Sequence, residues 1–439
     1  MKRPARFGLA RGLGLACAAA IACAKAPAPP APTPTPAPAR AAARAPAPAG
    51  AVLLVSIDGF RADYLERPEA ARLRGLAAQG VRARWLTPVF PSKTFPNHYS
   101  IVTGLYPEHH GIVSNTILDP ETGRWFRISD AHAVRDSSWW GGEPIWVTAV
   151  KQGLRSATFF WPGSEAAIDG VRPTYWERYD ARVPNAERVR RVLDWLSLPP
   201  ERAPSFVTLY FSEVDHAGHE FGPDAPETDS AIAHVDSAVG MLLAGLDARG
   251  LSGRVDVILV SDHGMAPLSP ERTIYLGDYL DLAGVTVVEA SPVAALVPPP
   301  GREEEVYERL HGADPHLAVY RRSETPPRWH YRDNARIPPI LAVADEGWRI
   351  STRSRPKGAA GGWIPERGTH GYDPAAPSMR ALFIARGPSF PQGVVVPPFT
   401  NIHLYALMTH LLGLVPAPND GSLDSVAAVL GTAPEPAAP

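Results

Sequence analysis

Runs of apolar residues recur along the chain at the spacing expected of buried strands that alternate with helices. Residues 52–57 form a continuous apolar run, which is typical of a strand buried on both faces. Four further runs predict strands: residues 156–161, 206–212, 255–260 and 381–385. Three segments have helical periodicity: residues 66–79, 186–197 and 229–248. This alternation predicts an α/β fold of three layers, in which helices cover a largely parallel central sheet.

Two parts of the chain depart from this alternation. Residues 286–350 are rich in Pro, Arg and Glu and contain shorter strand-like runs, so we expect a smaller inserted cap region there. Residues 425–439 predict a loose, Ala/Pro-rich tail. One large domain is therefore expected over residues 50–424.

The N-terminal residues predict export. Four basic residues stand in residues 1–11, and the short apolar stretch that follows cannot span a bilayer stably, so residues 1–24 are interpreted as a signal peptide. The protein is then periplasmic. Cys23 ends a loose lipoprotein cleavage box, and lipidation there would anchor the protein to the cell envelope; the alternative is a soluble protein cut near Ala22 or Ala24. The Ala/Pro repeats of residues 26–49 predict an extended linker.

Charge and cysteine content argue against a nonspecific nucleic-acid binder and exclude thiolate metal ligands in the domain. Residues 51–439 carry 36 basic and 45 acidic side chains, a net charge of −9, so no nucleic-acid-binding patch is evident. Both cysteines precede residue 24. A metal site in the domain must therefore use imidazole and carboxylate ligands, as catalytic zinc sites do.

Three predicted strands are each followed by an acid. Asp58 comes directly after residues 52–57, Asp215 follows residues 206–212, and Asp262 follows residues 255–260. The carboxyl ends of parallel strands meet at one edge of a sheet, where open α/β sheets bind their ligands. These carboxylates are expected to lie close together.

Three histidines accompany these acids. His219 lies four residues after Asp215, His263 is adjacent to Asp262, and His370 stands in Gly-Thr-His-Gly. Mixed Asp/His sets suit zinc, and six ligands are too many for one tetrahedral ion, so we predict two metals. Asp215, His219 and His370 could form one set, and Asp58, Asp262 and His263 the other. Gly264 is expected to permit the bend that aims Asp262 and His263 inward.

A nucleophile is expected in the loop at residues 91–99. Prolines fix its shape, and a helix-like pattern begins at Tyr99. Thr94 or Ser92 could be held as an alkoxide on zinc, and a nearby helix N-terminus would favour a phosphate. The alternative for Thr94 is a buried or helix-capping residue.

Six ordered motifs resemble the nucleotide pyrophosphatase/phosphodiesterase family of the alkaline phosphatase superfamily. The resemblance covers about residues 50–420, and the chain is similar to the family's bacterial type, without added cysteine-rich or nuclease-like modules. The motifs are Lys93-Thr94-Phe95-Pro96-Asn97-His98, Thr103-Gly104-Leu105-Tyr106-Pro107, Trp161-Pro162-Gly163-Ser164-Glu165, Asp215-His216-Ala217-Gly218-His219, Ser261-Asp262-His263-Gly264-Met265 and Gly368-Thr369-His370-Gly371-Tyr372.

The resemblance implies an alkaline-phosphatase-like fold and a role for each candidate residue. Thr94 would be the covalent nucleophile, and it would also contact the zinc that Asp58, Asp262 and His263 hold. Asn115 matches the family residue that donates a hydrogen bond to the phosphate. Phe95 and Tyr179 match positions that sandwich the nucleotide base, although Asn115 is also explained as a turn residue and the two aromatics as packing residues.

The resulting expectation is a phosphodiesterase with two Zn²⁺ ions per chain. It would hydrolyse small-molecule phosphodiesters and nucleoside triphosphates to nucleoside 5′-monophosphates. The alternatives are a phosphomonoesterase, a phosphonate hydrolase or a lysophospholipid/choline phosphodiesterase of the same superfamily, and a non-catalytic metal-binding protein. The aromatic pair, and the absence of an evident Arg near Thr94, favour the diesterase.

Overall fold

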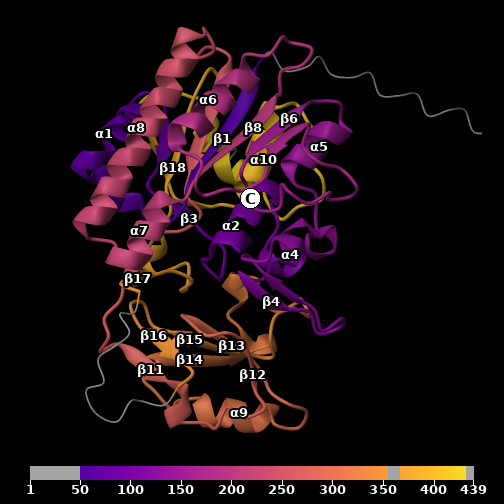
Figure 1. The fold of residues 1–439 in the computed structure, drawn as a ribbon, viewed down its shortest axis with the longest axis vertical. Helices are drawn as coiled ribbons and strands as arrows, with labels where there is room; N and C mark the ends of the chain where they lie inside the picture. The colour runs from indigo at the N-terminus through magenta and orange to yellow at the C-terminus, as the bar shows by residue number, and fades with distance from the viewer. Residues whose placement is uncertain (1–49, 354–365, 432–439) are drawn as a thin grey trace, which may run out of the picture. The chain divides into compact units, whose positions relative to one another are not determined.

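An eight-stranded sheet forms the centre of the computed structural model, which describes residues 50–353 and 366–431 (Figure 1). Neighbouring strands run parallel except at β18, which is antiparallel to both β2 and β9. The predicted, largely parallel sheet is confirmed. Its strands in spatial order are β19 (Val394–Val396), β2 (Val81–Ala83), β18 (Phe383–Arg386), β9 (Val255–Val260), β1 (Ala51–Ile57), β8 (Phe206–Phe211), β6 (Ser156–Phe159) and β7 (Tyr175–Glu177).

Helices cover both faces of this sheet because its central strands are apolar on both sides. In β1, Val52 and Leu54 belong to one hydrophobic core, and Leu53 and Val55 belong to the other. Each such side chain contributes about 1.5–3 kcal/mol when fully buried. The three-layer prediction is therefore confirmed. The first core is covered by α2 (Thr94–Thr103), α5 (Ile145–Lys151) and α10 (His403–Leu411), the second by α1 (Ala71–Ala78), α6 (Asn185–Leu196) and α8 (Pro226–Ala248).

Two element boundaries differ from the predictions for local reasons. The helix expected from residue 66 begins at Ala71, because Arg67 is extended before Pro68 and short 3-10 turns precede the helix. The strand expected to reach residue 161 ends at Phe159, because Phe160 takes a positive φ of 61° and turns the chain.

Residues 286–350 contain a second sheet, which packs on a core of its own on one face and shares the first core of the central sheet on the other. Its four antiparallel strands follow the order β12 (Thr286–Glu289), β13 (Val293–Val297), β15 (Ile340–Ala344) and β14 (Leu317–Arg321). Helix α9 (Glu303–Leu310) packs on β14 and β15, and β11 (Thr273–Tyr275) pairs with β16 (Arg349–Ser351). We call this unit the inserted sheet; it lies below the central sheet in Figure 1.

Part of the predicted C-terminal tail is helical. Residues expected in a loose tail form a 3-10 helix, Asp424–Leu430, because Val426 and Val429 are buried in the core. The signal peptide at 1–24, Cys23 and the linker at 26–49 lie outside the described residues, so export and lipid anchoring stay predictions.

Short elements connect these parts. They are β3 (Leu86–Thr87), α3 (Pro107–His110), β4 (Thr116–Leu118), β5 (Trp125–Arg127), α4 (Ala131–Arg135), α7 (Glu213–Phe221), β10 (Ala266–Pro267), β17 (Gly368–Thr369) and β20 (Phe399–Thr400).

Candidate active site

The three predicted acids lie at one edge of the central sheet. Strands β9, β1 and β8 are adjacent and parallel, so their carboxyl ends coincide. Asp58 follows β1 directly, Asp262 follows β9 by two residues, and Asp215 lies in the first turn of α7, just after β8. The sheet topology therefore brings together carboxylates that are far apart in sequence.

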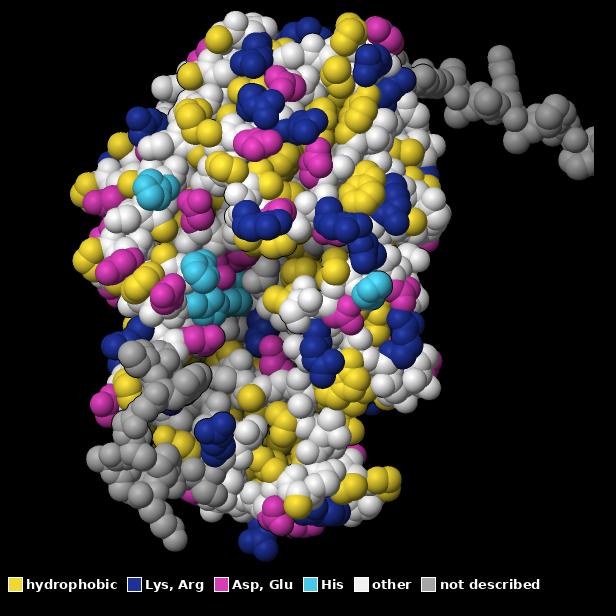
Figure 2. Space-filling view, viewed as in Figure 1, with side chains coloured by type: hydrophobic (Ala, Val, Ile, Leu, Met, Phe, Trp, Pro, Cys, Tyr) yellow, Lys and Arg dark blue, Asp and Glu magenta, His cyan; other side chains and the backbone are white. Residues whose placement is uncertain are grey.

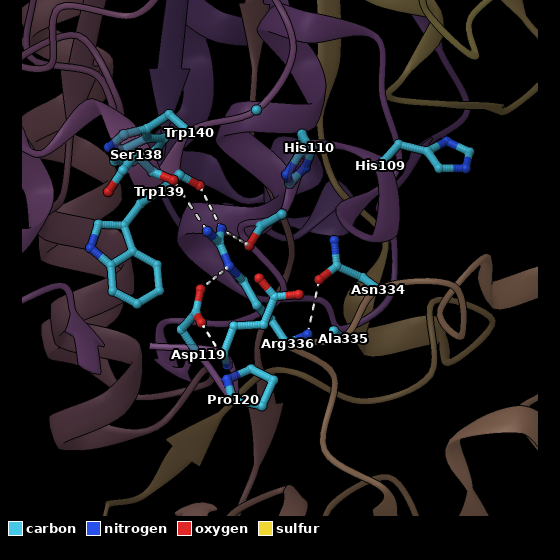
Figure 3. Close-up of a pocket in the computed structure, with 13 residues that line it drawn as sticks. His109, His110, Asp119, Pro120, Ser138, Trp139, Trp140, Asn334, Ala335 and Arg336 are labelled. Carbon is cyan, nitrogen blue, oxygen red and sulfur yellow. Dashed lines mark hydrogen bonds and ion pairs between the residues drawn. The ribbon is translucent and has the colours of Figure 1, made fainter. Parts of the chain in front are cut away.

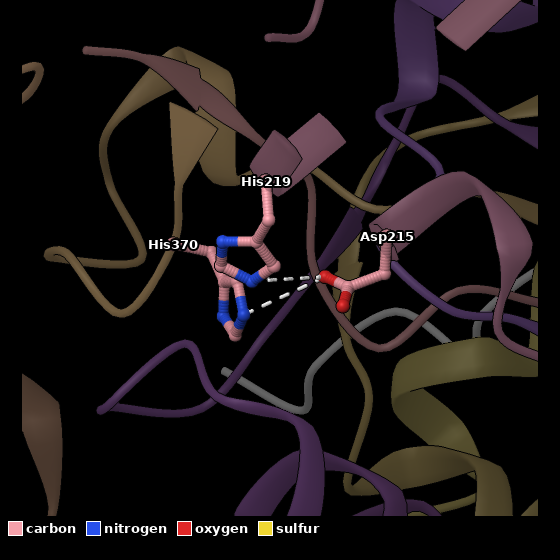
Figure 4. A group of neighbouring side chains, drawn as sticks. All are labelled: Asp215, His219 and His370. Atoms are coloured by element: carbon pink, nitrogen blue, oxygen red, sulfur yellow. Dashed lines mark ion pairs between the residues drawn. The ribbon is translucent and has the colours of Figure 1, made fainter. Parts of the chain in front are cut away.

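Asp215, His219 and His370 form the first carboxylate–imidazole group (Figure 4). The Asp215 Oδ1 atom lies 3.5 Å from His219 Nε2 and 3.6 Å from His370 Nε2. The Nδ1 atom of each ring lies against a backbone carbonyl, Gly368 O at 3.0 Å for His219 and Ser92 O at 2.8 Å for His370. A carbonyl can only accept, so Nδ1 carries the proton and Nε2 presents its lone pair.

Asp58, Asp262 and His263 form a second group beside the first. His263 Nε2 lies 2.9 Å from Asp262 Oδ2 and 3.5 Å from Asp58 Oδ1, and its Nδ1 donates to Gly264 O at 2.9 Å. The two groups adjoin, because Asp215 also lies within ligand distance of Asp58 and His263. The His263 and His370 rings stack with centroids 3.5 Å apart.

The buried carboxylates have one oxygen satisfied and one left without a donor. Asp58 Oδ2 accepts from the Tyr210 hydroxyl at 2.5 Å, and Asp262 Oδ1 accepts from the Gly59 N–H at 3.2 Å. Asp58 Oδ1, Asp262 Oδ2 and Asp215 Oδ1 have no hydrogen-bond donor. These oxygens face the imidazole Nε2 atoms, and although burial opposes it, Asp262 raises the pKa of His263, so this pair favours a bound cation or proton.

A cation resolves this arrangement. Burial, and then the neighbouring carboxylates Asp262 and Asp215, raise the pKa of Asp58 well above its ordinary value. Burial, with His263 and His219 nearby, holds the pKa of His370 well below its ordinary value and keeps it neutral. Oxygen and imidazole donors without thiolates suit zinc in its catalytic style. The described residues thus fit divalent metal.

Thr94 lies next to the second group, at the N-terminus of α2. Its Oγ1 atom is 3.3 Å from His263 Nε2. The helix begins at Thr94 itself and not at Tyr99 as predicted, because Pro96 falls in the first turn, where its missing N–H removes no helical hydrogen bond. The positive end of the α2 dipole therefore lies beside the hydroxyl, although the Phe95 N–H is bonded to Asn115 and the Asn97 N–H to Lys93 O.

Asn115 contacts the same turn. Its Oδ1 atom accepts from the Phe95 N–H at 3.0 Å. The amide is oriented by this bond, and its nitrogen remains the donor. The structure therefore places Asn115 beside the nucleophile candidate, in a position to serve as a hydrogen-bond donor to a phosphoryl oxygen.

A cavity of about 700 Å³ opens on the site. Phe95 and Tyr179 line it together with Thr94, Asp58 and Asp215. Each aromatic also packs at its back: Phe95 contacts Phe126 and Trp140, and Tyr179 meets Phe160 edge-to-face. Figure 2 shows histidine side chains gathered at a hollow on the face in view.

Comparison with known proteins decides the family. The Type I phosphodiesterase / nucleotide pyrophosphatase family matches residues 52–373. The chain belongs to this family.

Members of this phosphodiesterase family are similar in sequence to most of the chain. An uncharacterized pyrophosphatase/phosphodiesterase of Schizosaccharomyces pombe is 41% identical over 85% of this chain and 79% of its own length. A bis(5′-adenosyl)-triphosphatase of Xenopus laevis is 39% identical over 86% and 81%. An inactive threonine-to-alanine variant of murine ectonucleotide pyrophosphatase/phosphodiesterase 5, solved with AMP, superposes with a TM-score of 0.82 at 38% identity, covering 87% of this chain and 100% of that one.

These relatives establish the general activity. The fold is alkaline-phosphatase-like, and the protein is a nucleotide pyrophosphatase/phosphodiesterase, a hydrolase that acts on phosphodiester bonds. The relatives named are eukaryotic, so the bacterial type stays a prediction.

The structure places two further residues at the site that the sequence patterns did not assign. Tyr210 holds Asp58, as described, and His98 contacts three groups: Ser56 Oγ at 2.8 Å, Thr94 O at 2.9 Å and Asp262 Oδ2 at 3.3 Å. His98 thus lies within ligand distance of Asp58 and Asp262, but both of its ring nitrogens have hydrogen-bond partners, so it positions the site.

Gly264 serves a different purpose from the predicted one. Its φ is not in the left-handed region. A Cβ there would instead clash with the carbonyl oxygen of Ser378. Glycine is required for the close approach of two backbone segments beside His263.

Proposed function

We propose that the protein is a zinc-dependent enzyme that releases nucleoside 5′-monophosphates from nucleotide diesters and nucleoside triphosphates through a covalent threonine intermediate. The observation that carries this proposal is Thr94: its hydroxyl lies at a helix N-terminus, next to two carboxylate–imidazole groups and at the wall of an aromatic-lined cavity. The AMP complex of the murine relative, inactive after a threonine-to-alanine change, supports both the nucleophile and the substrate class.

Two zinc ions are proposed, one for each group. Asp215, His219 and His370 would hold one, and Asp58, Asp262 and His263, with Thr94, the other. Zinc bound there would lower the pKa of the Thr94 hydroxyl and neutralise charge on the phosphoryl oxygens.

The chain's own residues account for the two chemical steps. Thr94 Oγ1 attacks phosphorus, which forms a threonyl–phosphate ester and breaks the bond to the leaving-group oxygen. Water then cleaves this ester, which releases the monophosphate and restores the hydroxyl. Asn115 donates to a non-bridging oxygen in both steps, and the positive end of the α2 dipole stabilises the charge that develops there.

A substrate panel tests the proposed reaction. We expect the full chain to hydrolyse thymidine 5′-(p-nitrophenyl phosphate) with a higher kcat/KM than p-nitrophenyl phosphate or p-nitrophenylphosphocholine. The reason is that the cavity offers aromatic walls for a base and a second ester group. Preference for the monoester or for the choline ester would contradict the nucleotide assignment and select the corresponding alternative.

The aromatic pair is expected to set nucleotide affinity. Phe95→Ala and Tyr179→Ala should each weaken use of the thymidine diester by about 1–3 kcal/mol in kcat/KM, the usual range for stacking on a base. Bis-p-nitrophenyl phosphate, which has no base, is the matched control substrate and should be affected much less. Equal losses on both substrates would mean that the two rings only hold the local structure.

A further inference from the structure

Glu289, the last residue of β12, reaches from the inserted sheet to both sides of the nucleophile. Its Oε1 accepts a hydrogen bond from Lys93 Nζ, and its Oε2 accepts one from Ser114 Oγ. Lys93 and Ser114 immediately precede Thr94 and Asn115. One carboxylate therefore links the residue before the nucleophile to the residue before the phosphate-binding amide.

These contacts close a ring around the reacting group. Lys93, Thr94 and Phe95 are consecutive, and the Phe95 N–H donates to Asn115 Oδ1 at 3.0 Å. Asn115 leads back to Ser114 and Glu289. Two short chain segments, residues 93–95 and residues 114–115, thus carry the Thr94 hydroxyl and the Asn115 amide. The Phe95–Asn115 hydrogen bond joins these segments at one end, and the Glu289 carboxylate joins them at the other.

The Lys93 side chain is buried and directed at Glu289, away from solvent. Its side chain is only 6% exposed, and Nζ also donates to Ser291 O at 3.3 Å. A Cβ at Gly371 would come within 2.8 Å of Lys93 Cε, so the lysine stem runs closely over the residue after His370. A buried cation needs a partner, and Glu289 is its only carboxylate partner among the described residues.

A β-bulge directs Glu289 to this position. Val287 pairs with Leu296 and Glu289 pairs with Ala295, so β12 uses two residues where β13 uses one. The extra residue, Val288, is buried in the core that the inserted sheet shares with the central sheet. Bulges commonly re-aim a side chain beside an active site.

The inserted sheet is held firmly against the segment that carries Ser114 and Asn115. The Tyr331 hydroxyl donates to Val113 O at 2.8 Å. Figure 3 shows Arg336, whose guanidinium donates to Asp119 and to the carbonyls of Gly111 and Trp139 at 2.8–3.2 Å. A cavity of about 320 Å³ surrounds Arg336 at the contact between the inserted sheet and the segment around His110 and Trp139. Because protein acceptors already bind the Arg336 guanidinium, we interpret this cavity as part of that contact and not as a ligand site.

We propose that Glu289 is a positioning residue for catalysis, which sets the placement of Thr94 relative to Asn115 from the inserted sheet. The inference rests on the proposed function, in which Thr94 attacks and Asn115 binds the phosphoryl oxygen. Glu289 contacts neither the substrate nor the candidate metal groups directly. Its loss should therefore slow the chemical step while leaving substrate binding and metal content nearly intact.

Two variants separate the contact of Glu289 with Lys93 from its contact with Ser114. In Glu289→Gln we expect kcat for the thymidine diester to fall about 10- to 100-fold, the scale of loss for misplacing a reacting group by up to about 1 Å, with KM changed less than about threefold. Ser114→Ala, which leaves the Lys93–Glu289 pair in place, should lower kcat by a smaller factor. Glu304→Gln, which removes the exposed ion pair with Arg321 on the same inserted sheet, is the matched control and should keep wild-type kcat.

A double-mutant cycle tests whether Ser114 acts through the amide. In an Asn115→Ala background, Ser114→Ala should change kcat by less than about twofold, because the group that it positions is gone. Metal content and Tm are measured for each variant. A folded, metal-replete Glu289→Gln enzyme with wild-type kcat would overturn the proposal, and so would additive effects in the cycle.

The outcomes separate this inference from the proposed function. If Glu289→Gln does not fold, Ser114→Ala and the double-mutant cycle test the positioning role instead. Ser114→Ala keeps Lys93 paired with Glu289, so it is expected to fold. Activity in Thr94→Ala would refute the proposed function itself, whatever Glu289 does. Loss of activity in Thr94→Ala with full activity in both Glu289→Gln and Ser114→Ala would refute only the positioning role.

Discussion

Replacing Thr94 with alanine should lower kcat for nucleotide diesters at least about 1,000-fold, the scale of loss seen when a covalent nucleophile is removed. The physical reason is that no other described hydroxyl is placed 3.3 Å from His263 Nε2 at the N-terminus of a helix. The variant should keep its metal and its Tm, because Thr94 is at the edge of the ligand groups and half-buried. Steady-state kinetics together with metal analysis make the measurement.

Two further variants bracket this result. Thr94→Ser retains a hydroxyl and should retain part of the rate. Ser92→Ala is the control for the neighbouring hydroxyl, which is fully buried and donates to Tyr372 O at 2.9 Å. Near-normal turnover in Thr94→Ala would mean that water is the nucleophile. An inactive Ser92→Ala enzyme with intact structure would contradict the assignment of Thr94 as the nucleophile.

Removal of metal should abolish turnover, and zinc should restore it. Without a cation, three carboxylates converge in a largely buried site, and Asp58 Oδ1 and Asp215 Oδ1 have no hydrogen-bond donor, which is an unfavourable arrangement. Metal should therefore also stabilise the fold, by about 2.7 kcal/mol for each bound ion at a free-ion concentration of 100 times its Kd. Activity and Tm are to be followed through chelation and re-addition. Full activity in a rigorously metal-free sample would refute the two-metal proposal.

Single ligand substitutions test the number of ions. His219→Ala and Asp262→Ala should each remove one metal per chain, because they belong to different groups. His216→Ala is the matched control on the same helix, since its side chain is 82% exposed and outside both groups. Loss of both ions in each ligand variant would indicate one shared site.

The sequence patterns predicted the parts of this site that follow from sheet topology. Apolar strands buried on both faces are recognisable, and an acid at the end of each one marks the carboxyl edge. Asp58 and Asp262 could be assigned in this way because β1 and β9 pair directly. His370 was proposed as a ligand from its residue type and its Gly-Thr-His-Gly context alone, because no strand pattern indicates that Gly368–Thr369 pairs with β10.

The supporting contacts could not be predicted, because they join segments that no periodicity relates. Lys93 and Glu289 are 196 positions apart, and Tyr210 and Asp58 are 152 apart. Tyr210 stands in a buried apolar strand, where its only signal was a hydroxyl without an evident partner. The start of α2 was misplaced for a local reason: the two prolines around Thr94 suggested a loop, whereas Pro96 is compatible with the first helical turn.

The orientation of the three imidazoles has a consequence for how this site tolerates change over evolutionary time. His219, His263 and His370 are each fixed through a main-chain carbonyl, and every amino acid supplies such an acceptor. No point mutation can delete these acceptors. Sequence divergence in the segments that carry them is then limited by the path of the backbone, as at Gly264, where any side chain would push two segments apart. Variants that impair metal binding at a distance should accordingly map to tightly packed glycines more often than to polar neighbours.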